Sequence, residues 1–492
     1  MTELEAIRAE LAALHAALGR EGLGVRSGLR GMQAANAVLR RHPLVTARAS
    51  VEGLRARLKE AQGEERKRLR RLFFGCVEAH VQARLAPLDD AAAFVLAGSG
   101  ARVGGEFVHY FEVTPWLQRQ GSHELRAELA RQMEGVYLAT NHLLRRLLED
   151  EDRLLASLGF EGYLGWCRAK KGLAYQEMLP AFEESLSRTA PLYLDRLGAW
   201  VEAEIGHPLE GLTRFDCIHL LRLKSFDQHF PPARLKQIVS LLEGLGLAVR
   251  HPHIRLDMTL RRRKNPQAVC LGVRIPEEIH LVIKPQGGLL DAETLLHELG
   301  HALHLAHFDP ALPFEYRYLP LNRGLSETFA FLFQGLLANE PFLLALGLER
   351  AEAVRLARRR RLKDLALWRR YAAKLVAEVR MWQAGGPDGG ALYAETLTRH
   401  TGFRYAPSGY LADLEPEFYA ADYLRAWMAE AQLTAWLEGR FGEGWALERR
   451  SWELVGSLWR RGEAETLERV LAQLGLAPFD PAPLERRLAA AR

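Results

Sequence analysis

Apolar residues recur every three or four positions over much of the chain, with charged residues between them. This spacing places the apolar side chains on one face of an α-helix, and it predicts amphipathic helices at residues 4–39, 51–85, 123–158 and 173–204. In the middle of the chain the pattern changes to short runs rich in Val, Ile and Leu, bounded by Pro or Gly. These runs, at residues 247–250, 254–258, 269–273 and 279–283, predict a small β-sheet at about residues 247–284. Helical spacing then returns, so the sequence predicts a mainly α protein with one small sheet.

Two glycine-rich stretches interrupt the helical pattern. In residues 98–105, Val103 stands where a dinucleotide-binding fingerprint needs its third glycine, so we interpret this stretch as a loop without a nucleotide site. Residues 385–390 read Gly-Gly-Pro-Asp-Gly-Gly and predict a flexible turn.

The most specific chemical signal lies just after the predicted sheet, in the run Leu-His-Glu-Leu-Gly-His at residues 296–301. His297 and His301 are four positions apart, so on a helix of about residues 291–307 both imidazoles can face one ion. Neutral imidazole is a good ligand for Zn²⁺, and Glu298 beside the pair can take a proton from a water that the metal makes acidic. The competing interpretation is a pair of core histidines on an amphipathic helix. A chance match is expected in about one chain of this length in twenty, so the sequence favours one zinc ion per chain.

Two residues compete to be the third metal ligand. His307 has the spacing of a metzincin ligand, but His304 occupies the position where that pattern needs a glycine to turn the chain. Glu327 is the single carboxylate in an apolar helical run within about residues 324–338. A carboxylate buried among Leu, Phe and Ala is costly unless it is paired or binds a metal. We therefore predict the ligand set His297, His301 and Glu327, a known catalytic zinc arrangement.

These residues resemble the thimet oligopeptidase and oligoendopeptidase F family of zinc metallopeptidases. The resemblance is carried by residues 297–304, by the Ser-Glu-Thr-Phe helix around Glu327 and by the segment 263–270, and it extends more loosely over residues 400–427. It implies a mainly helical, bilobed zinc-peptidase fold with a deep substrate channel and a small sheet beside the active-site helix. It also implies cleavage of short oligopeptides, with Glu298 as the general base.

The resemblance extends to residues that contact the substrate. Amide hydrolysis builds negative charge on the carbonyl oxygen, which a tyrosine hydroxyl can stabilise. The family uses tyrosines from a Gly-Tyr loop and the following helix in this way. It implies Tyr423 as the oxyanion donor, Tyr410 as a substrate contact and Tyr419 as a weaker third, with His400 in the place of a histidine that the family has before the loop.

The predicted sheet offers a second kind of substrate contact. An edge strand ahead of the zinc helix can accept a peptide backbone by strand addition, and the resemblance places Gly272 and Val273 near that contact. The alternative is that these strands are only scaffold.

The helical signals suggest two domains. Gly206-His207-Pro208 ends the N-terminal helices, so we expect a helical lobe at residues 1–205 and a catalytic lobe at residues 206–492.

Composition narrows the class of protein. The formal net charge is +5, from 66 basic and 61 acidic residues, and the basic run 358–361 lies in a helical, charge-mixed region, so we expect no nucleic-acid partner. The four cysteines have no metal-binding or disulfide spacing, and neither a signal peptide nor a membrane-spanning apolar run is evident. The expectation is a cytoplasmic protein that acts on oligopeptides away from membranes, as a monomer or a homodimer.

Two other functions stay open. A zinc carboxypeptidase of the carboxypeptidase Taq type has the same ligand set, although the His-Glu-Ser-Gln segment of that family is replaced here by Leu-Ser-Glu-Thr at residues 325–328. A non-catalytic helical binding protein could also keep the motif for structural reasons.

Overall fold

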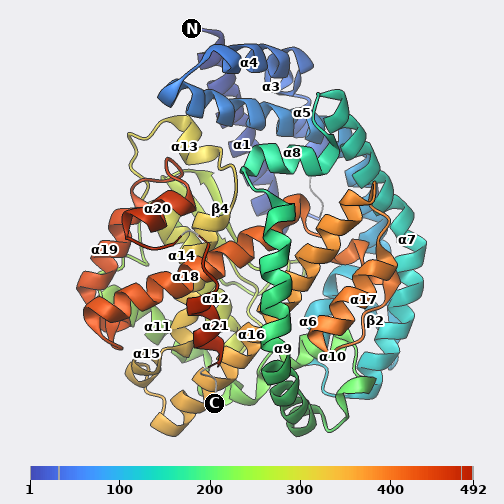
Figure 1. Ribbon diagram of the computed structural model, residues 1–492, viewed down its shortest axis with the longest axis vertical. Helices are drawn as coiled ribbons and strands as arrows, with labels where there is room; N and C mark the ends of the chain where they lie inside the picture. Colours follow the sequence, from blue (N-terminus) through green and yellow to red (C-terminus); the bar gives the residue numbers. More distant parts are fainter. Residues whose placement is uncertain (1, 32–33, 478, 490–492) are drawn as a thin grey trace. The chain divides into compact units, whose positions relative to one another are not determined.

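The computed structural model describes residues 2–31, 34–477 and 479–489. The chain forms two compact units, whose helices and strands are labelled in Figure 1. Unit 1 consists of Met1–Asp90, Asp227–Ala353 and Ala429–Asp480, and unit 2 of Ala91–Phe226, Val354–Met428 and Pro481–Arg492.

This division differs from the expected lobes at residues 1–205 and 206–492, because residues 1–205 contribute to both units. Three of the five crossings between the units lie inside the helices α5 (Gly63–Gly98), α16 (Arg350–Gln383) and α18 (Tyr419–Phe441). Amphipathic spacing shows which face of a helix is buried but not which partner buries it. A boundary inside a continuous helix therefore leaves no mark in the sequence.

Unit 1 contains the three-stranded sheet and the helices around it. The strands are β3 (Ile254–Asp257), β4 (Val269–Arg274) and β5 (Glu278–Val282), in the order β3-β5-β4, with β3 parallel and β4 antiparallel to β5. The first of the predicted strands, at residues 247–250, is instead a turn after α11. The helices that lie wholly in unit 1 are α1 (Glu3–Arg26), α2 (Ala35–Leu39), α3 (Pro43–Thr46), α4 (Arg48–Glu60), α11 (Pro232–Gly244), α12 (Leu289–Ala306), α13 (Phe314–Tyr318), α14 (Gly324–Gln334), α15 (Glu340–Ala345), α19 (Arg449–Trp459) and α20 (Leu467–Gln473).

The sheet and two of these helices position the predicted metal site. The helix α12 packs against β4 and β5, α14 packs on α12, and α1 lies along β4. Buried leucines and alanines of α12, including Leu295, Leu299 and Leu303, anchor it in the core. Asp291, which lies in the first turn of α12, accepts the N–H groups of Gln286 and Gly287 and so closes the loop that leads into the helix.

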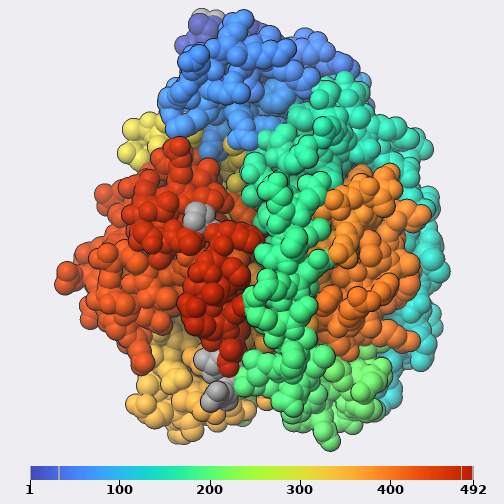
Figure 2. All heavy atoms as spheres, in the orientation of Figure 1, coloured from blue at the N-terminus to red at the C-terminus, as the bar shows by residue number. Residues whose placement is uncertain are grey.

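Unit 2 is almost entirely helical. Its complete helices are α6 (Val113–Arg119), α7 (His123–Ser157), α8 (Gly162–Lys171), α9 (Tyr175–Ile205), α10 (Arg214–Leu220), α17 (Gly390–Thr401) and α21 (Ala482–Ala489). The outer face of α9 is visible over most of its length in Figure 2. Short 3₁₀ helices connect the elements of both units, at Tyr110–Glu112, Leu209–Gly211, Lys224–His229, Gly335–Ala338, Pro407–Gly409, Leu411–Asp413, Pro416–Phe418 and Trp445–Leu447.

The prediction of a loop at residues 98–105 is partly wrong. Residues 100–105 form the first strand and the turn of a β-hairpin, in which β1 (Gly100–Val103) pairs antiparallel with β2 (Glu106–His109). Gly104 and Gly105 form the two-residue turn with φ of 54° and 85°. Glycine adopts such positive φ values easily, so a glycine pair between short strands is typical of a hairpin.

The prediction of a mainly α protein with a small sheet is confirmed. Within the described part of the chain, none of the helices combines the length and the apolar character that a membrane crossing needs.

Candidate metal centre

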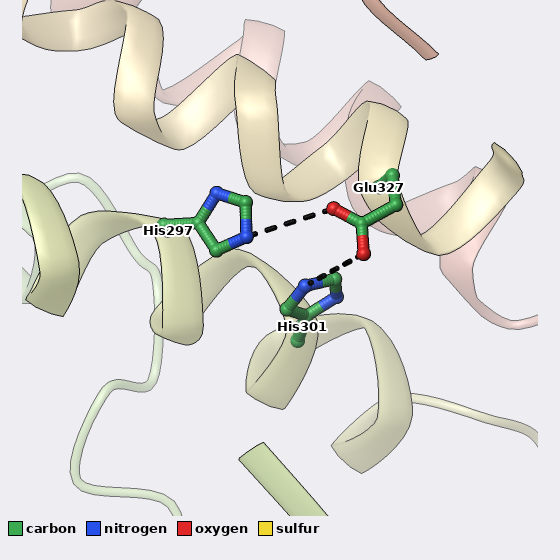
Figure 3. Close-up of side chains that lie close together, drawn as sticks. All are labelled: His297, His301 and Glu327. Atoms are coloured by element: carbon green, nitrogen blue, oxygen red, sulfur yellow. Dashed lines mark ion pairs between the residues drawn. The ribbon is translucent and has the colours of Figure 1, made fainter. Parts of the chain in front are cut away.

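Three side chains from α12 and α14 converge in unit 1 (Figure 3). Nε2 of His297 lies 3.6 Å from one carboxylate oxygen of Glu327, and Nε2 of His301 lies 3.6 Å from the other. One ligand atom from each residue lies within 4.8 Å of the other two. Glu327 is buried and both histidines are partly exposed. Among the described residues, this is the group of His, Cys, Asp and Glu whose geometry suits a metal ion.

A hydrogen-bonded chain of side chains fixes the ring of His297. Nε2 of Gln334 donates to Glu293 at 2.9 Å, and this bond turns the amide oxygen of Gln334 toward Nδ1 of His297, 2.8 Å away. Because an amide oxygen only accepts, Nδ1 of His297 carries the proton and donates. In the neutral form of this ring, the lone pair is then on Nε2, the nitrogen that faces Glu327.

The ring of His301 is held in a similar way. Its Nδ1 lies 2.8 Å from the hydroxyl of Ser326, the residue before Glu327 on α14. Burial lowers the pKa of His301 well below its usual range, and the neighbouring His297 lowers it further. The neutral ring can therefore direct the lone pair of Nε2 toward Glu327.

The donor set fits a cation. Two imidazole lone pairs and a carboxylate face one another, an arrangement that is repulsive unless positive charge lies between them. Two histidines and one glutamate, each histidine bonded through its other nitrogen to a neighbouring group, are a zinc ligand set with the supporting contacts that such sites usually have.

Glu298 follows His297 on α12, and its side chain faces the strand β4. Its carboxylate accepts the backbone N–H of Cys270 in β4. Burial raises the pKa of Glu298 to about 7, while the Cys270 N–H and the charge of Arg26 oppose that rise. Burial likewise raises the pKa of the Cys270 thiol well above its usual range.

The other histidines of this region do not join the three ligands. His304 is fully buried against the rings of Phe308 and Phe329, and burial lowers its pKa to about 3. His307 follows the end of α12 and packs against Trp459, with Nδ1 bonded to the carbonyl of Leu303 at 2.8 Å. The metzincin arrangement is therefore not formed.

Both β4 residues that the resemblance links to substrate have partners within the protein. Val273 is fully buried, and a Cβ atom on Gly19 of α1 would lie 3.4 Å from its Cγ2. The carbonyl of Gly272 accepts a hydrogen bond from Nε2 of His15 at 2.8 Å. Their contact with a substrate stays a prediction.

The predicted tyrosines lie in unit 2. Tyr410 is buried, and its hydroxyl donates to the carbonyl of Pro387 at 2.7 Å. The rings of Tyr419 and Tyr423 lie 4.9 Å apart, edge to face, on the first turns of α18. The backbone carbonyl of His400 accepts a hydrogen bond from Arg369, and burial lowers the pKa of the His400 ring to about 4. The catalytic and substrate-binding roles of all four residues stay predictions.

Sequence reasoning missed the residues that support the three ligands. Gln334 is seven positions after Glu327, two helical turns along the same face of α14, and Ser326 is adjacent to Glu327, so a search for polar residues on that face could have found both. Glu293 is similarly four residues before His297 on α12. His15 is 257 positions from Gly272, and no local pattern connects them.

The comparisons with known proteins agree with this architecture. Neither protein-family models nor curated proteins give a match to the sequence. Among solved structures, PZ peptidase A with an inhibitor has a TM-score of 0.65 and 13% sequence identity, over 93% of this chain and 85% of that one. A protein assigned provisionally as oligoendopeptidase F, from Bacillus anthracis, has a TM-score of 0.62 and 14% identity, over 92% and 84%. The chain therefore shares the fold of these two proteins over most of its length.

Proposed function

We propose that the protein is a zinc-dependent metallopeptidase that hydrolyses peptide bonds of oligopeptides. The observation that carries the proposal is the convergence of His297, His301 and Glu327, with the Nδ1 atoms of both rings bonded elsewhere. The fold supports it, because both structural neighbours carry names of peptidases. Fold alone does not determine an activity, so the site is the stronger argument.

We assign metal binding and proton transfer to different residues. His297, His301 and Glu327 would hold the zinc ion. When bound, zinc supplies Lewis acidity, which polarises a peptide carbonyl and makes a water more acidic. Glu298, adjacent to His297, would accept the proton of the attacking water and return it to the leaving amine.

We also propose roles for residues outside the three ligands. Tyr423 would donate a hydrogen bond to the oxygen on which charge develops, with Tyr410 and Tyr419 as substrate contacts. His400 would be a further substrate contact. Gly272 and Val273 in β4 would lie beside the peptide backbone.

Zinc content and turnover, measured together on the purified protein, test the proposal. Glu298→Gln should leave the zinc content unchanged and abolish cleavage of a peptide mixture followed by mass spectrometry. His297→Ala should lose both the metal and the activity, whereas Glu349→Gln, an exposed glutamate of unit 1, should keep both. Full peptidase activity in Glu298→Gln would refute the assigned base.

The two alternatives give different results in the same assays. A peptide blocked at its C-terminus is still cut by an endopeptidase but resists a carboxypeptidase of the Taq type. A purified protein that contains no zinc and does not lose stability on chelation would support a non-catalytic binding protein.

A further inference from the structure

The edge of the sheet beside the metal centre is formed by β4. In β5, the N–H groups of Ile279 and of Ile283, just past its end, donate to carbonyls on the β3 side. The backbone groups of alternate residues point to opposite sides, so those of His280 face β4. His280 is opposite Leu271 in the antiparallel register. Because neighbouring residues of a strand point their backbone groups to opposite sides, Cys270 and Gly272 direct theirs to the outer edge.

Side chains occupy two of these outward groups. The N–H of Cys270 faces the carboxylate of Glu298. Two residues further along, the carbonyl of Gly272 accepts the Nε2–H of His15 at 2.8 Å. At about 3.4 Å per residue, these positions are about 7 Å apart along the strand. Along this edge, the predicted general base Glu298 contacts one residue of β4, and His15 of α1 contacts another, two residues further on.

The His15 ring is held in place by its surroundings. It meets the ring of Tyr318 edge to face, with centroids 5.0 Å apart, and the hydroxyl of Tyr318 accepts the N–H of Ile275 at 2.8 Å. His15 and Tyr318 thus bond to backbone groups of β4 and of the residue just after it. An imidazole N–H on an outward strand carbonyl takes the position that the N–H of an added strand would take, since both donate at about 2.9 Å.

We propose that His15 competes with peptide substrates for the Gly272 carbonyl, so that this residue of α1 limits how far a bound peptide pairs along β4. The inference rests on the proposed function, and it adds a specificity-determining residue far from the metal ligands in sequence. A peptide that pairs only through the carbonyl of Cys270 leaves His15 undisturbed. A peptide that extends to Gly272 gains one backbone hydrogen bond and breaks the bond to His15.

The expected effect is modest because a net hydrogen bond is weak. Removing the competing donor should tighten binding of a long peptide roughly 2- to 10-fold. The gain should depend on one N–H of the peptide, the one that reaches Gly272. The affinity of a peptide that lacks this N–H should not change when the carbonyl of Gly272 is freed.

Three full-length variants separate this effect from general changes in α1. His15→Ala removes the donor and keeps a good helix former, and His15→Gln keeps an N–H donor on a flexible side chain. Arg20→Ala changes an exposed residue in the next turn of α1 and serves as the matched control. The probe is a fluorescein-labelled, alanine-rich octapeptide, together with its series of single N-methyl derivatives.

Binding is measured by fluorescence anisotropy with a chelator present, so that no cleavage occurs. We expect His15→Ala to tighten binding of the parent octapeptide, while His15→Gln and Arg20→Ala stay near the wild type. N-methylation at one position should abolish the gain from His15→Ala, and at the other positions it should leave the gain intact. With the protein as purified, KM should fall in His15→Ala and kcat should stay the same.

Several outcomes would overturn the inference. Equal tightening for every N-methyl derivative would mean that His15 only obstructs the peptide, and weaker binding would mean that His15 itself contacts it. An unchanged affinity would remove the competition altogether. If peptides are cleaved in a Glu298-dependent way without this coupling, only the inference fails. If the coupling appears without zinc or cleavage, only the proposed function fails.

Discussion

Gly300 of α12 lies directly against Ala330 of α14. A Cβ atom on Gly300 would lie 2.6 Å from the Cα of Ala330 and 2.7 Å from the carbonyl oxygen of Phe329. No side chain fits there, so the two helices touch backbone to backbone at this point. The contact lies one residue before His301 and three residues after Glu327, and it allows the two helices to bring their ligands together.

Gly300→Ala should therefore destabilise the protein and weaken zinc binding. In an unobstructed helix the change to alanine stabilises by up to about 1 kcal/mol. Here the added methyl must push backbone apart, and overpacking of this kind costs about 1–3 kcal/mol. Chemical denaturation and a zinc competition assay measure the two effects. Gly22→Ala in α1, where no atom lies within 4 Å of the added Cβ, is the control and should not destabilise. A Gly300→Ala protein as stable as Gly22→Ala would contradict the close contact.

Gln334→Leu should weaken zinc binding without displacing a ligand. The variant keeps the size of the side chain but removes the oxygen that accepts from Nδ1 of His297 and the amide that reaches Glu293. Loss of such a supporting contact typically lowers metal affinity about 10- to 100-fold. Isothermal titration against a competing chelator gives the affinity. Gln62→Leu, at an exposed position of unit 1, should bind zinc like the wild type. Equal zinc affinity in Gln334→Leu and Gln62→Leu would show that Gln334 does not orient the ring.

The sequence predicted those parts of the site that depend on local spacing. The four-residue separation of His297 and His301 placed both rings on one helix face, and the apolar surroundings of Glu327 indicated that its carboxylate needs a partner. The predicted helix at residues 291–307 is α12 (Leu289–Ala306), and the one at 324–338 is α14 (Gly324–Gln334) followed by a 3₁₀ turn at Gly335–Ala338. Their positions follow from apolar periodicity, which is a local property.

The remaining features depend on contacts between distant segments. The bond between His15 and Gly272 and the close contact of Gly300 with Ala330 arise only when helices pack, and neither residue pair has a spacing that signals it. The strand expected at residues 247–250 has apolar character like that of the true strands, but the segment is irregular and ends in a turn.

Glu327→Gln should abolish the effect of zinc on stability. A ligand that binds only the folded state stabilises it by about 2.7 kcal/mol at a hundred times its dissociation constant. Replacing the carboxylate by a neutral amide removes the only acidic member of the ligand set, so the added metal should no longer raise the melting temperature. Differential scanning calorimetry with zinc and with EDTA measures the shift. The Glu349→Gln control should respond like the wild type, and a full zinc response in Glu327→Gln would exclude the carboxylate as a ligand.

Glu378 of α16, in unit 2, should make the stability of the protein fall as the pH rises. Burial raises its pKa to about 8, while Lys374 and Arg370 lower it and Glu415 and Asp413 raise it. Lys374 lies 3.7 Å from Glu378 but bonds more closely to Glu415, at 2.6 Å. In the unfolded chain a glutamate titrates near pH 4.3. Between about pH 4.3 and the folded pKa near 8, the folded protein keeps a proton that the unfolded chain has lost, so stability decreases over this interval and levels off above it.

Glu378→Gln isolates this contribution. Near pH 5 the glutamine and the protonated glutamate carry the same charge, so the variant and the wild type should be about equally stable. At pH 8.5 the variant should be more stable, by up to about 4 kcal/mol. Urea denaturation of both proteins across this range measures the difference. Glu395→Gln, at an exposed position of α17 in unit 2, should show no such pH-dependent gain. A Glu378→Gln protein that is less stable than the wild type at pH 8.5 would mean that the ionised carboxylate is stabilised by Lys374, and that Glu378 titrates well below 8.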